Sequence, residues 1–216
     1  LGVAFADEGI ALRKAGITTP IMVLNPEISS YKAMIAYHLE PEMYNLSGLQ
    51  SFIELAKEKN SNSYPIHLKI DTGMHRLGFE KEDISELISL LEHNNFVKVT
   101  SIFSHLAATD NLDFKDFTLQ QIQLFELISN QIATTLNIQP IRHILNTSGI
   151  FNYSEYQFEM VRLGIGIYGV GNSEEEQSSL ENVSTLKSII SQIRTVEPNE
   201  SIGYSRKFMV KKEMRV

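Results

Sequence analysis

The chain has 216 residues, which is enough for one large domain or for one domain with part of another. Hydrophobic residues make up 43% of the sequence, so it can bury a sizeable core, and no stretch is long and apolar enough to span a membrane. The formal net charge of −7 argues against a nucleic-acid or anionic-membrane surface. The absence of cysteine excludes disulfides and thiolate metal sites and is consistent with a cytoplasmic protein.

Strand-like and helix-like segments alternate along most of the chain. We expect strands over residues 2–6, 20–25, 42–46, 66–70, 99–105, 141–146 and 160–170. We expect helices around residues 10–12, 29–37, 49–56, 84–91 and 117–132, with Gly16 ending the first and Ser47 capping the third. Repeated strand–helix units imply a parallel sheet, and this many imply an α/β fold with a partial (β/α)8 TIM-type barrel.

The pattern changes after Gly171. Residues 173–184 are acidic and polar, which is typical of a linker. Residues 185–216 have the pattern of antiparallel strands around a turn at Pro198 and Asn199, and they are too few to close a core by themselves. We therefore expect a barrel domain over residues 1–172, a linker over 173–184, and the beginning of a C-terminal β domain over 185–216.

The most informative stretch runs from Ile66 to Phe79 and reads IHLKIDTGMHRLGF. An apolar run typical of a strand in a parallel sheet ends there in a charged, glycine-bearing loop. Lys69 lies inside the strand, where a charge is costly unless it is paired. The C-terminal ends of parallel strands carry the chemistry of α/β enzymes. On the residues alone, an ordinary ion pair of Asp71 with Lys69 or Arg76 explains the pattern equally well.

Five such segments stand at predicted strand ends: KIDTGMHRLGF, FSHLAATD, HILNTSG, MVRLGIGIYG and PNESIGYS. Their order and spacing resemble the alanine racemase family, pyridoxal-phosphate (PLP) enzymes in which a barrel domain precedes a β domain. The opening LGVAFADEGIALRKAGITTPIMVLN is similar to the second and third strands of that barrel. The resemblance covers essentially the whole chain. It implies PLP as the cofactor and a barrel that lacks its first strand here.

The resemblance gives roles to three residues at the first strand ends. Lys69 matches a lysine that is carbamylated in the family, where the carbamate anion holds a neighbouring arginine. Arg76 matches that arginine, which contacts the phenolic oxygen of the cofactor and lies near the substrate carboxylate. His105 matches the histidine that stacks near the cofactor ring and hydrogen-bonds the catalytic tyrosine. A structural role is the alternative for His105.

The resemblance also outlines the cofactor cradle. Arg162 matches the arginine that hydrogen-bonds the pyridine nitrogen. Because arginine can only donate, that nitrogen stays unprotonated, which favours racemisation over transamination or elimination. The phosphate site falls on Asn146, on Thr147 in place of the usual serine, and on the backbone N–H groups of Gly164 and Ile165. The alternative is that residues 146–149 form only a turn.

Tyr204 matches the catalytic tyrosine of the family, which reaches the active site of the other subunit. The resemblance therefore implies a homodimer with shared active sites. A tyrosine needs a lowered pKa to act as a base, and His105 with a nearby arginine would provide it. Ser205 stands where the family usually has glycine. The alternative for Tyr204 is an ordinary strand residue.

The chain begins at Leu1 rather than at methionine, and we expect it to be the central piece of a longer protein. The resemblance places the Schiff-base lysine upstream of Leu1. We expect the full-length parent to interconvert L- and D-alanine for peptidoglycan precursors in the cytoplasm, and the isolated chain to be inactive. The alternatives are a racemase for another amino acid such as serine, a non-catalytic PLP-binding barrel, and a fusion with the muramyl-tripeptide ligase. We expect no metal ion, no nucleic acid and no membrane partner.

Overall fold

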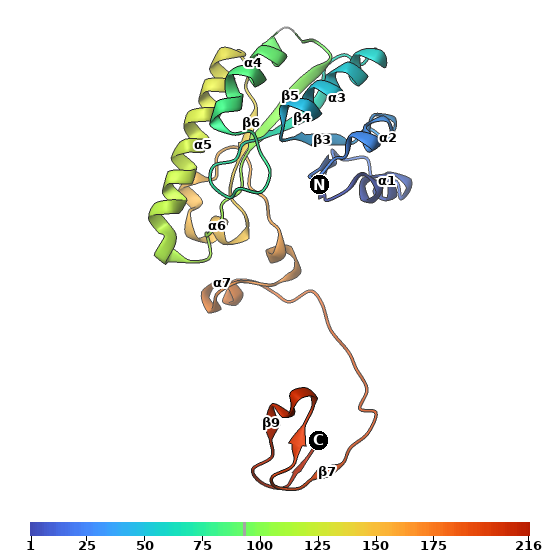
Figure 1. Ribbon diagram of the computed structural model, residues 1–216, viewed down its shortest axis with the longest axis vertical. Coiled ribbons are helices and arrows are strands. Elements are labelled where there is room, and N and C mark those ends of the chain that lie inside the picture. Colours follow the sequence, from blue (N-terminus) through green and yellow to red (C-terminus); the bar gives the residue numbers. More distant parts are fainter. Residues whose placement is uncertain (93) are drawn as a thin grey trace. The chain divides into compact units, whose positions relative to one another are not determined.

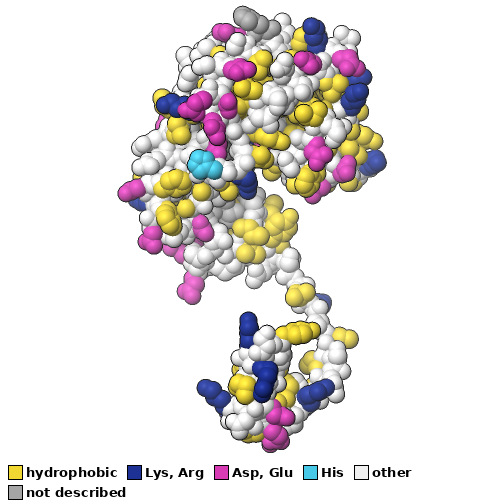
Figure 2. Space-filling model, in the orientation of Figure 1, with side chains coloured by type: hydrophobic (Ala, Val, Ile, Leu, Met, Phe, Trp, Pro, Cys, Tyr) yellow, Lys and Arg dark blue, Asp and Glu magenta, His cyan; other side chains and the backbone are white. Residues whose placement is uncertain are grey.

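The computed structural model describes residues 1–92 and 94–216 and divides into two compact units, Leu1–Glu181 and Asn182–Val216 (Figure 1). The first unit contains one six-stranded sheet, and the second contains short antiparallel strand pairs. Figure 2 shows acidic and basic side chains dispersed over the visible face of the first unit, without one sign of charge covering it.

The sheet of the first unit follows chain order, from β1 to β6, and every neighbouring pair of strands is parallel. The strands are β1 (Gly2–Val3), β2 (Met22–Val23), β3 (Glu40–Met43), β4 (Tyr64–Lys69), β5 (Val97–Phe103) and β6 (Ile141–His143). The sheet curls into a half-barrel, which confirms the predicted α/β fold with a partial TIM-type barrel. The strands β1, β2 and β6 are shorter than the sequence pattern predicted, and β3 begins two residues earlier, at Glu40.

Helices α1 to α5 connect the strands of the sheet and lie around its outside, whereas α6 and α7 follow its last strand (Figure 1). They are α1 (Ala6–Lys14), α2 (Tyr31–Ala36), α3 (Leu46–Glu58), α4 (Ile84–Glu92), α5 (Lys115–Thr135), α6 (Thr147–Asn152) and α7 (Glu174–Ser178). Short 3₁₀ turns cover Ile28–Ser30, Lys81–Asp83, Leu112–Phe114, Ser154–Tyr156, Ile165–Tyr168 and Tyr204–Arg206. The helices predicted at residues 49–56, 84–91 and 117–132 are therefore confirmed with slightly wider bounds.

The hydrophobic core lies between the sheet and these helices. Ile66 and Leu68 of β4 are fully buried in one cluster with Phe52 of α3, Leu87 of α4 and Phe125 of α5. Successive strand side chains point to opposite faces of a sheet. The residues that alternate with Ile66 and Leu68 therefore face the inside of the half-barrel, away from the helices.

The cap of helix α3 lies two residues before the predicted one. Asn45, not Ser47, precedes the helix, and its Oδ1 atom accepts a hydrogen bond from the Gly48 N–H at 2.7 Å. Ser47 lies in the first turn and donates its hydroxyl to the same Oδ1 atom at 2.9 Å. The prediction of Ser47 as the cap is wrong because a better-placed amide oxygen precedes it.

The strand predicted over residues 160–170 is not formed. The N–H of Arg162 donates to the Leu145 carbonyl, and the N–H of Gly164 donates to the Thr147 hydroxyl rather than to a neighbouring strand. A 3₁₀ turn over Ile165–Tyr168 follows, and Gly169 ends it with a φ of 76°. Backbone groups satisfied by a side chain and by a turn cannot also form a strand ladder, so the apolar pattern of this segment misled the sequence analysis.

Residues 173–184, predicted as a linker, begin with α7. Ser173 caps this helix, since its Oγ atom accepts a hydrogen bond from the Glu176 N–H at 3.1 Å. Glu176 is buried, and its carboxylate accepts hydrogen bonds from the Asn172 N–H at 2.8 Å and the Ser148 hydroxyl at 3.3 Å. These contacts attach α7 to the first unit, so an acidic sequence alone does not make this segment free.

The second unit contains two antiparallel pairs of two-residue strands. β7 (Thr195–Val196) pairs with β10 (Met214–Arg215), and β8 (Ser201–Ile202) pairs with β9 (Phe208–Met209). The chain turns between β7 and β8 at Asn199, which has a φ of 71°. The predicted antiparallel strands around this turn are thus present, but residues 185–194 form no strand.

Candidate active site

The inner face of the half-barrel carries polar side chains in two rows. Strand register places Glu42 beside His67 and His67 beside Ser101, and one row further it places Lys69, Phe103 and His143 side by side. A register shift between Ile66 and His67 brings Ser101 opposite His67. Barrel interiors are usually filled by branched aliphatic residues, so buried polar rows at this place indicate a functional site.

Arg162 lies at the strand ends beside these rows, held by backbone carbonyls. Its Nη1 atom donates to the carbonyl of His143 at 3.0 Å, and its Nη2 atom donates to the carbonyls of Ser104 at 2.6 Å and Ile144 at 3.1 Å. The guanidinium carbon also lies 5.2 Å from the centre of the Phe103 ring. Burial lowers the pKa of Arg162 to about 10, although the Glu42 carboxylate acts to raise it. The Arg162 side chain therefore stays charged at neutral pH.

Arg162 also starts a chain of side-chain hydrogen bonds across the barrel. Its Nη1 atom lies 2.6 Å from Nδ1 of His143, and Nε2 of His143 lies 3.0 Å from the Ser101 hydroxyl. The same hydroxyl lies 2.7 Å from Nδ1 of His67. The last link joins Nε2 of His67 to the Glu40 carboxylate at 2.8 Å.

Arg162 determines which atom donates in each hydrogen bond of this series. Arginine only donates, so Nδ1 of His143 accepts and its Nε2–H donates to Ser101. The Ser101 hydroxyl is then free to donate to His67, whose Nε2–H donates to Glu40. Five residues, on four strands and one loop, thus share one direction of hydrogen bonding, which keeps the imidazole of His143 in a single orientation.

Both histidines next to Arg162 are neutral at physiological pH. Burial lowers the pKa of His143 to about 2, and the electrostatic influence of Arg162 and, to a smaller extent, of His67 acts in the same direction. Burial, with Arg162, Arg76 and Lys69, lowers the pKa of His105 to about 4. Nη2 of Arg162 lies 3.4 Å from Nδ1 of His105, so the structure brings these two predicted site residues together.

Lys69 is paired with a residue that the sequence analysis did not single out. Its Nζ atom lies 3.2 Å from Oε1 of Glu42 on the neighbouring strand, and it also lies 5.7 Å from the centre of the Phe103 ring. The side chain of Glu42 is 0% exposed and that of Lys69 is 7% exposed. Burial raises the pKa of Glu42 to about 7, although Lys69, Arg162 and Arg76 act to lower it.

Asp71 accepts hydrogen bonds from the backbone of the loop that follows β4. It does not form an ion pair with Lys69 or Arg76. Its Oδ1 atom accepts the N–H groups of Gly73 at 2.8 Å, Met74 at 3.0 Å and His75 at 3.2 Å. Gly78 closes the loop with a φ of 144°, where an added Cβ would lie 2.4 Å from the Asp71 nitrogen. The alternative pairing of Asp71 with Lys69 or Arg76 is therefore wrong. Arg76 itself is exposed on this loop.

The predicted phosphate site is folded around the Thr147 hydroxyl. Its oxygen accepts the N–H of Gly164 at 3.1 Å and the N–H of Gly166 at 3.2 Å. Asn146 caps α6 by accepting the Gly149 N–H at 2.9 Å, and it also accepts the Thr109 hydroxyl at 2.7 Å. Asn146 thus has a clear structural role, and Ile165 follows Gly164 in the 3₁₀ turn.

Tyr204 belongs to the second unit, where it is 99% exposed at the start of a 3₁₀ turn. The next residue, Ser205, has a φ of 60°, in the left-handed region that favours glycine. The departure from the usual glycine noted in the sequence therefore falls at a position where the backbone favours glycine.

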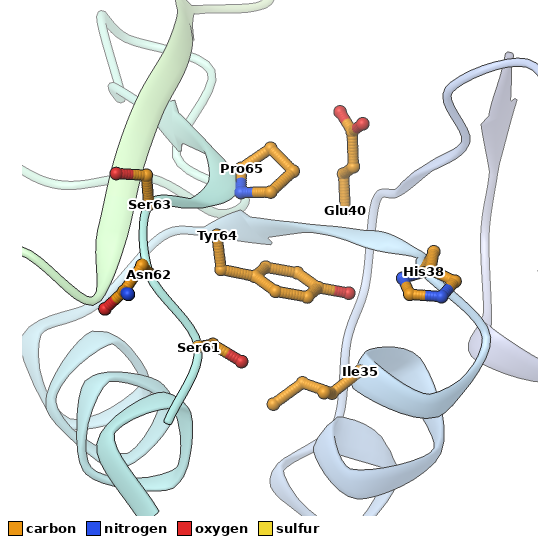
Figure 3. A pocket seen from close by; sticks show the side chains of 8 residues that line it. All are labelled: Ile35, His38, Glu40, Ser61, Asn62, Ser63, Tyr64 and Pro65. Atoms are coloured by element: carbon orange, nitrogen blue, oxygen red, sulfur yellow. The ribbon is translucent and has the colours of Figure 1, made fainter. Parts of the chain in front are cut away.

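A pocket of about 290 Å³ lies at the opposite ends of the strands, where β3 and β4 begin (Figure 3). Glu40, Tyr64 and Pro65 line it together with Ile35, His38 and residues 61–63. The hydroxyl of Tyr64 donates to the carbonyls of Met34 and Leu39, so this residue serves the fold. The pocket is separate from Lys69 and Arg162, which lie at the C-terminal strand ends.

Known proteins similar to this chain identify the fold and the family. Residues 1–172 match the family model described as "Alanine racemase, N-terminal domain". The chain belongs to this family. "Alanine racemase 1" of Clostridium acetobutylicum is 33% identical over 99% of the chain and 56% of its own length. "Alanine racemase" of Fusobacterium nucleatum is 36% identical over 96% of the chain and 56% of its own length.

Solved alanine racemases have the same fold. The enzyme of Streptomyces lavendulae superposes with a TM-score of 0.87 at 25% identity, over 100% of the chain and 58% of the solved one. An alanine racemase of Clostridium difficile 630 superposes with a TM-score of 0.81 at 30% identity, over 100% and 57%. The chain therefore spans a little more than half the length of the alanine racemases it matches.

Two further properties follow from the part of the chain that the structure describes. No helix within residues 1–92 and 94–216 is long and apolar enough to cross a membrane. Among the same residues, no three His, Asp or Glu side chains are grouped so that they could hold a metal ion.

Sequence reasoning missed Glu40, Glu42, His67, Ser101 and His143. A signal for Glu40, Glu42 and His67 was present, since polar residues alternate with apolar ones in EPEM and IHLK. In a buried strand this alternation means that one face packs on helices and the other encloses something polar.

Proposed function

We propose that the full-length protein containing this chain is a PLP-dependent alanine racemase that interconverts L- and D-alanine. Membership of the family and the names of the relatives support this activity. We further propose that it acts in the cytoplasm as a homodimer and supplies D-alanine for peptidoglycan precursors. The domain division into residues 1–172, 173–184 and 185–216 remains part of this proposal.

The observation that carries the proposal is the setting of Arg162. Its terminal nitrogens are committed to three carbonyls and to His143, so a permanent cation is fixed at the strand ends. Its Nε atom makes no hydrogen bond within the described residues, and we assign it to the pyridine nitrogen of the cofactor. Because arginine has no proton to release at neutral pH, this contact leaves the nitrogen unprotonated.

PLP, when bound, withdraws electrons from the α-carbon of an amino acid and so makes its proton removable. By holding the ring nitrogen unprotonated, Arg162 would make the bound ring a weaker electron acceptor than a protonated one, which would favour racemisation. A carboxylate in place of Arg162 would favour the other reactions that this cofactor supports.

The residues around Thr147 fit the phosphate group of the cofactor. The Thr147 oxygen already accepts two backbone N–H groups, so its hydrogen is available for an acceptor such as a phosphate oxygen. A side chain at Gly166 would bring Cβ within 2.7 Å of the Thr147 methyl group, which explains why glycine stands there. We assign Asn146, Gly164 and the N–H of Ile165 to the same cradle.

The remaining roles concern protons and the substrate. We propose Tyr204 as the base that acts in the active site of the other subunit, with neutral His105 as its hydrogen-bond partner. We propose that Arg76, which is exposed on the loop after β4, binds the substrate carboxylate. An arginine fork suits a carboxylate because it offers two parallel donors.

The decisive experiment is a coupled assay on the full-length protein. L-alanine and PLP are supplied, and D-alanine is detected through D-amino-acid oxidase, with serine as the competing substrate. We expect D-alanine to form and serine to react more slowly. No D-amino acid from either substrate would reject a racemase, and faster reaction of serine would assign a different substrate.

A further inference from the structure

The loops that carry Arg76 and His105 leave neighbouring strands, and a buried hydrogen bond joins them. The hydroxyl of Thr72, in the loop after β4, lies 2.8 Å from the hydroxyl of Ser104, directly after β5. Thr72 is 5% exposed and Ser104 is 1% exposed. A buried hydroxyl without a partner is costly, because it has lost its contact with water. The two hydroxyls therefore satisfy each other, whichever of them donates.

Ser104 also contacts the rest of the site through its backbone. Its carbonyl accepts a hydrogen bond from Nη2 of Arg162 at 2.6 Å, and its N–H donates to the carbonyl of His143 at 3.3 Å. The next residue along the chain, His105, lies with its Nδ1 atom 3.4 Å from Nη2 of Arg162. The hydrogen bond to Thr72 thus connects the loop after β4 to the residues around Arg162.

Gln121 of α5 contacts the same two loops. It is 1% exposed, its Oε1 atom accepts the N–H of Ala107 at 3.1 Å, and its Nε2 atom donates to the carbonyl of His105 at 3.5 Å. A Cβ atom added at Gly73 would lie 3.7 Å from Cγ of Gln121 and 3.3 Å from the ring of Phe117. The start of α5 therefore packs on the loop after β4 and also holds the loop after β5 by hydrogen bonds.

The loop after β4 is ordered within itself, so what remains to be fixed is its position. Besides the contacts of the Asp71 carboxylate, the N–H of Asp71 donates to the Phe79 carbonyl at 3.0 Å, and the N–H of Phe79 donates to the Lys69 carbonyl at 2.8 Å. These bonds close the loop on its own strand. Within residues 1–92 and 94–216, the hydrogen bond of Thr72 is the one that joins this loop to the loop after β5.

We propose that the hydroxyl pair of Thr72 and Ser104 is a clamp that fixes the loop after β4 against the loop after β5, with Gln121 as its support. The clamp determines where Arg76 lies relative to His105, and thus how well Arg76 meets the substrate carboxylate. Its members are positioning residues, because they act through Arg76 and His105. This inference rests on the proposed function for the role of Arg76 and deepens it.

The first test is amide hydrogen exchange in the full-length protein, which requires no racemase activity. Thr72→Val removes the hydroxyl and keeps the shape of the side chain. We expect residues 73–78 and 105–107 to exchange about five- to tenfold faster, since a buried hydrogen bond that holds both loops is lost. Thr72→Ser keeps a hydroxyl at this position and should return the exchange of both loops toward that of the wild type.

Thr118→Val is the matched control. Thr118 is a fully buried threonine of α5, and its hydroxyl has no hydrogen-bond partner among the described residues. The same substitution there removes a buried hydroxyl without breaking a hydrogen bond. Exchange in both loops should therefore stay as in the wild type.

The second test is the racemisation kinetics of the same variants. Thr72→Val should raise KM for alanine about five- to tenfold with kcat nearly unchanged, because a displaced Arg76 binds the carboxylate less well. Combining Thr72→Val with Ser104→Ala leaves neither hydroxyl buried without a partner, so stability should return toward the wild type. KM should stay raised in this double variant, because the clamp is still absent. A merely structural role would restore KM together with stability.

Faster exchange in only one of the two loops would overturn the clamp, as would an equal effect of Thr118→Val or a KM that recovers in the double variant. If Thr72→Val does not fold, Ser104→Ala and the double variant break the same hydrogen bond and decide by the same measurements. A wild type without racemase activity would reject the proposed function, whereas the exchange of the two loops would still decide whether the clamp exists.

Discussion

Nδ1 of His143 lies 2.6 Å from Nη1 of Arg162, and this contact determines which nitrogen of the histidine carries the proton. A guanidinium cannot accept, so the proton of His143 is on Nε2 and is donated to Ser101. The ring also stacks on Phe103, with centroids 4.8 Å apart. His143 is thus fixed by one neighbour on each edge and one on its face, and it fixes Arg162 in return.

We predict that His143→Asn destabilises the protein by about 1–3 kcal/mol. Arg162 and Ser101 then lose a buried partner, and an unsatisfied buried polar group costs about this much. Chemical denaturation measures the change in the free energy of unfolding. His75→Asn is the matched control, because the side chain of His75 is 83% exposed and the change should stay within about 0.5 kcal/mol. Equal effects of the two substitutions would contradict the role of His143.

The second prediction concerns pH. The folded pKa values of His143 and His105, about 2 and about 4, lie below the ordinary value of 6.5. Between pH 6.5 and 4, the unfolded chain therefore binds protons that the folded chain does not bind. Stability should fall as the pH falls through this window, by up to about 1.4 kcal/mol per pH unit for each histidine.

The comparison of the wild type with His143→Asn isolates the contribution of His143 to this pH dependence of stability. Glu42 acts in the opposite direction, because its folded pKa of about 7 lies above its ordinary value of 4.5 and its contribution to stability is lost as the pH rises. That contribution is common to both proteins. The variant should lose stability less steeply on acidification, and parallel curves would show that His143 is protonated in the folded state.

A third prediction separates the buried ion pair from an exposed one. Glu42→Gln or Lys69→Met alone should each cost about 3–5 kcal/mol, because one buried charge is left unpaired, and the double variant should cost clearly less than their sum. The exposed pair of Arg142 and Glu159, with nitrogen and oxygen 2.7 Å apart, is the control cycle. Its coupling should be about 0–1 kcal/mol. Additive effects at Glu42 and Lys69 would show that the two do not interact.

The fourth prediction is that Arg162→Lys lowers the racemase activity of the full-length protein about ten- to a hundredfold. Arg162 donates at once to the carbonyls of Ser104, His143 and Ile144, and a lysine cannot reach all of them from one nitrogen. A loss of about 1.5–3 kcal/mol of charge-assisted hydrogen bonding corresponds to this range. Arg142→Lys, outside the site, should keep its activity. Unchanged turnover and PLP affinity in Arg162→Lys would leave Arg162 a structural role only.

The sequence predicted the architecture well where periodicity and turns agree. Strand β4 and helices α3, α4 and α5 have strong apolar faces, and their alternation is sufficient to indicate a parallel α/β sheet. The prediction of a strand over residues 160–170 was wrong for a definite reason. Its apolar residues resemble a strand, but its backbone N–H groups go to Leu145 and to the Thr147 hydroxyl, which only the folded chain brings near.

The site was predictable in part. Arg162 and His105 were found through motifs at strand ends, and the structure brings them together. The partners Glu42 and Ser101 could not be found in this way, because their contacts depend on strand register. The register shift in β4 and β5 decides that Ser101 meets His67, and no local sequence signal encodes that shift.

The last prediction tests Tyr204 as a base for one enantiomer. Tyr204→Phe removes only the phenolic oxygen of an exposed side chain, so the fold should be unaffected. Proton abstraction from L-alanine should fall by about 10²–10⁴-fold, the usual cost of losing a general base, while α-proton exchange of D-alanine persists through the other base. Deuterium exchange at the α-carbon measures each enantiomer separately, and Tyr37→Phe is the control.

Mixed dimers extend this test to the subunit interface. If Tyr204 acts in the active site of the other subunit, a dimer of one Tyr204→Phe protomer and one Arg162→Glu protomer contains one intact site, which joins Arg162 of the first protomer to Tyr204 of the second. Mixing the two inactive variants should therefore restore part of the activity. Tyrosine acting within its own chain predicts no recovery, since each protomer would then carry one damaged site. Equal loss of exchange from both enantiomers would reject a one-sided base, whatever the mixed dimers do.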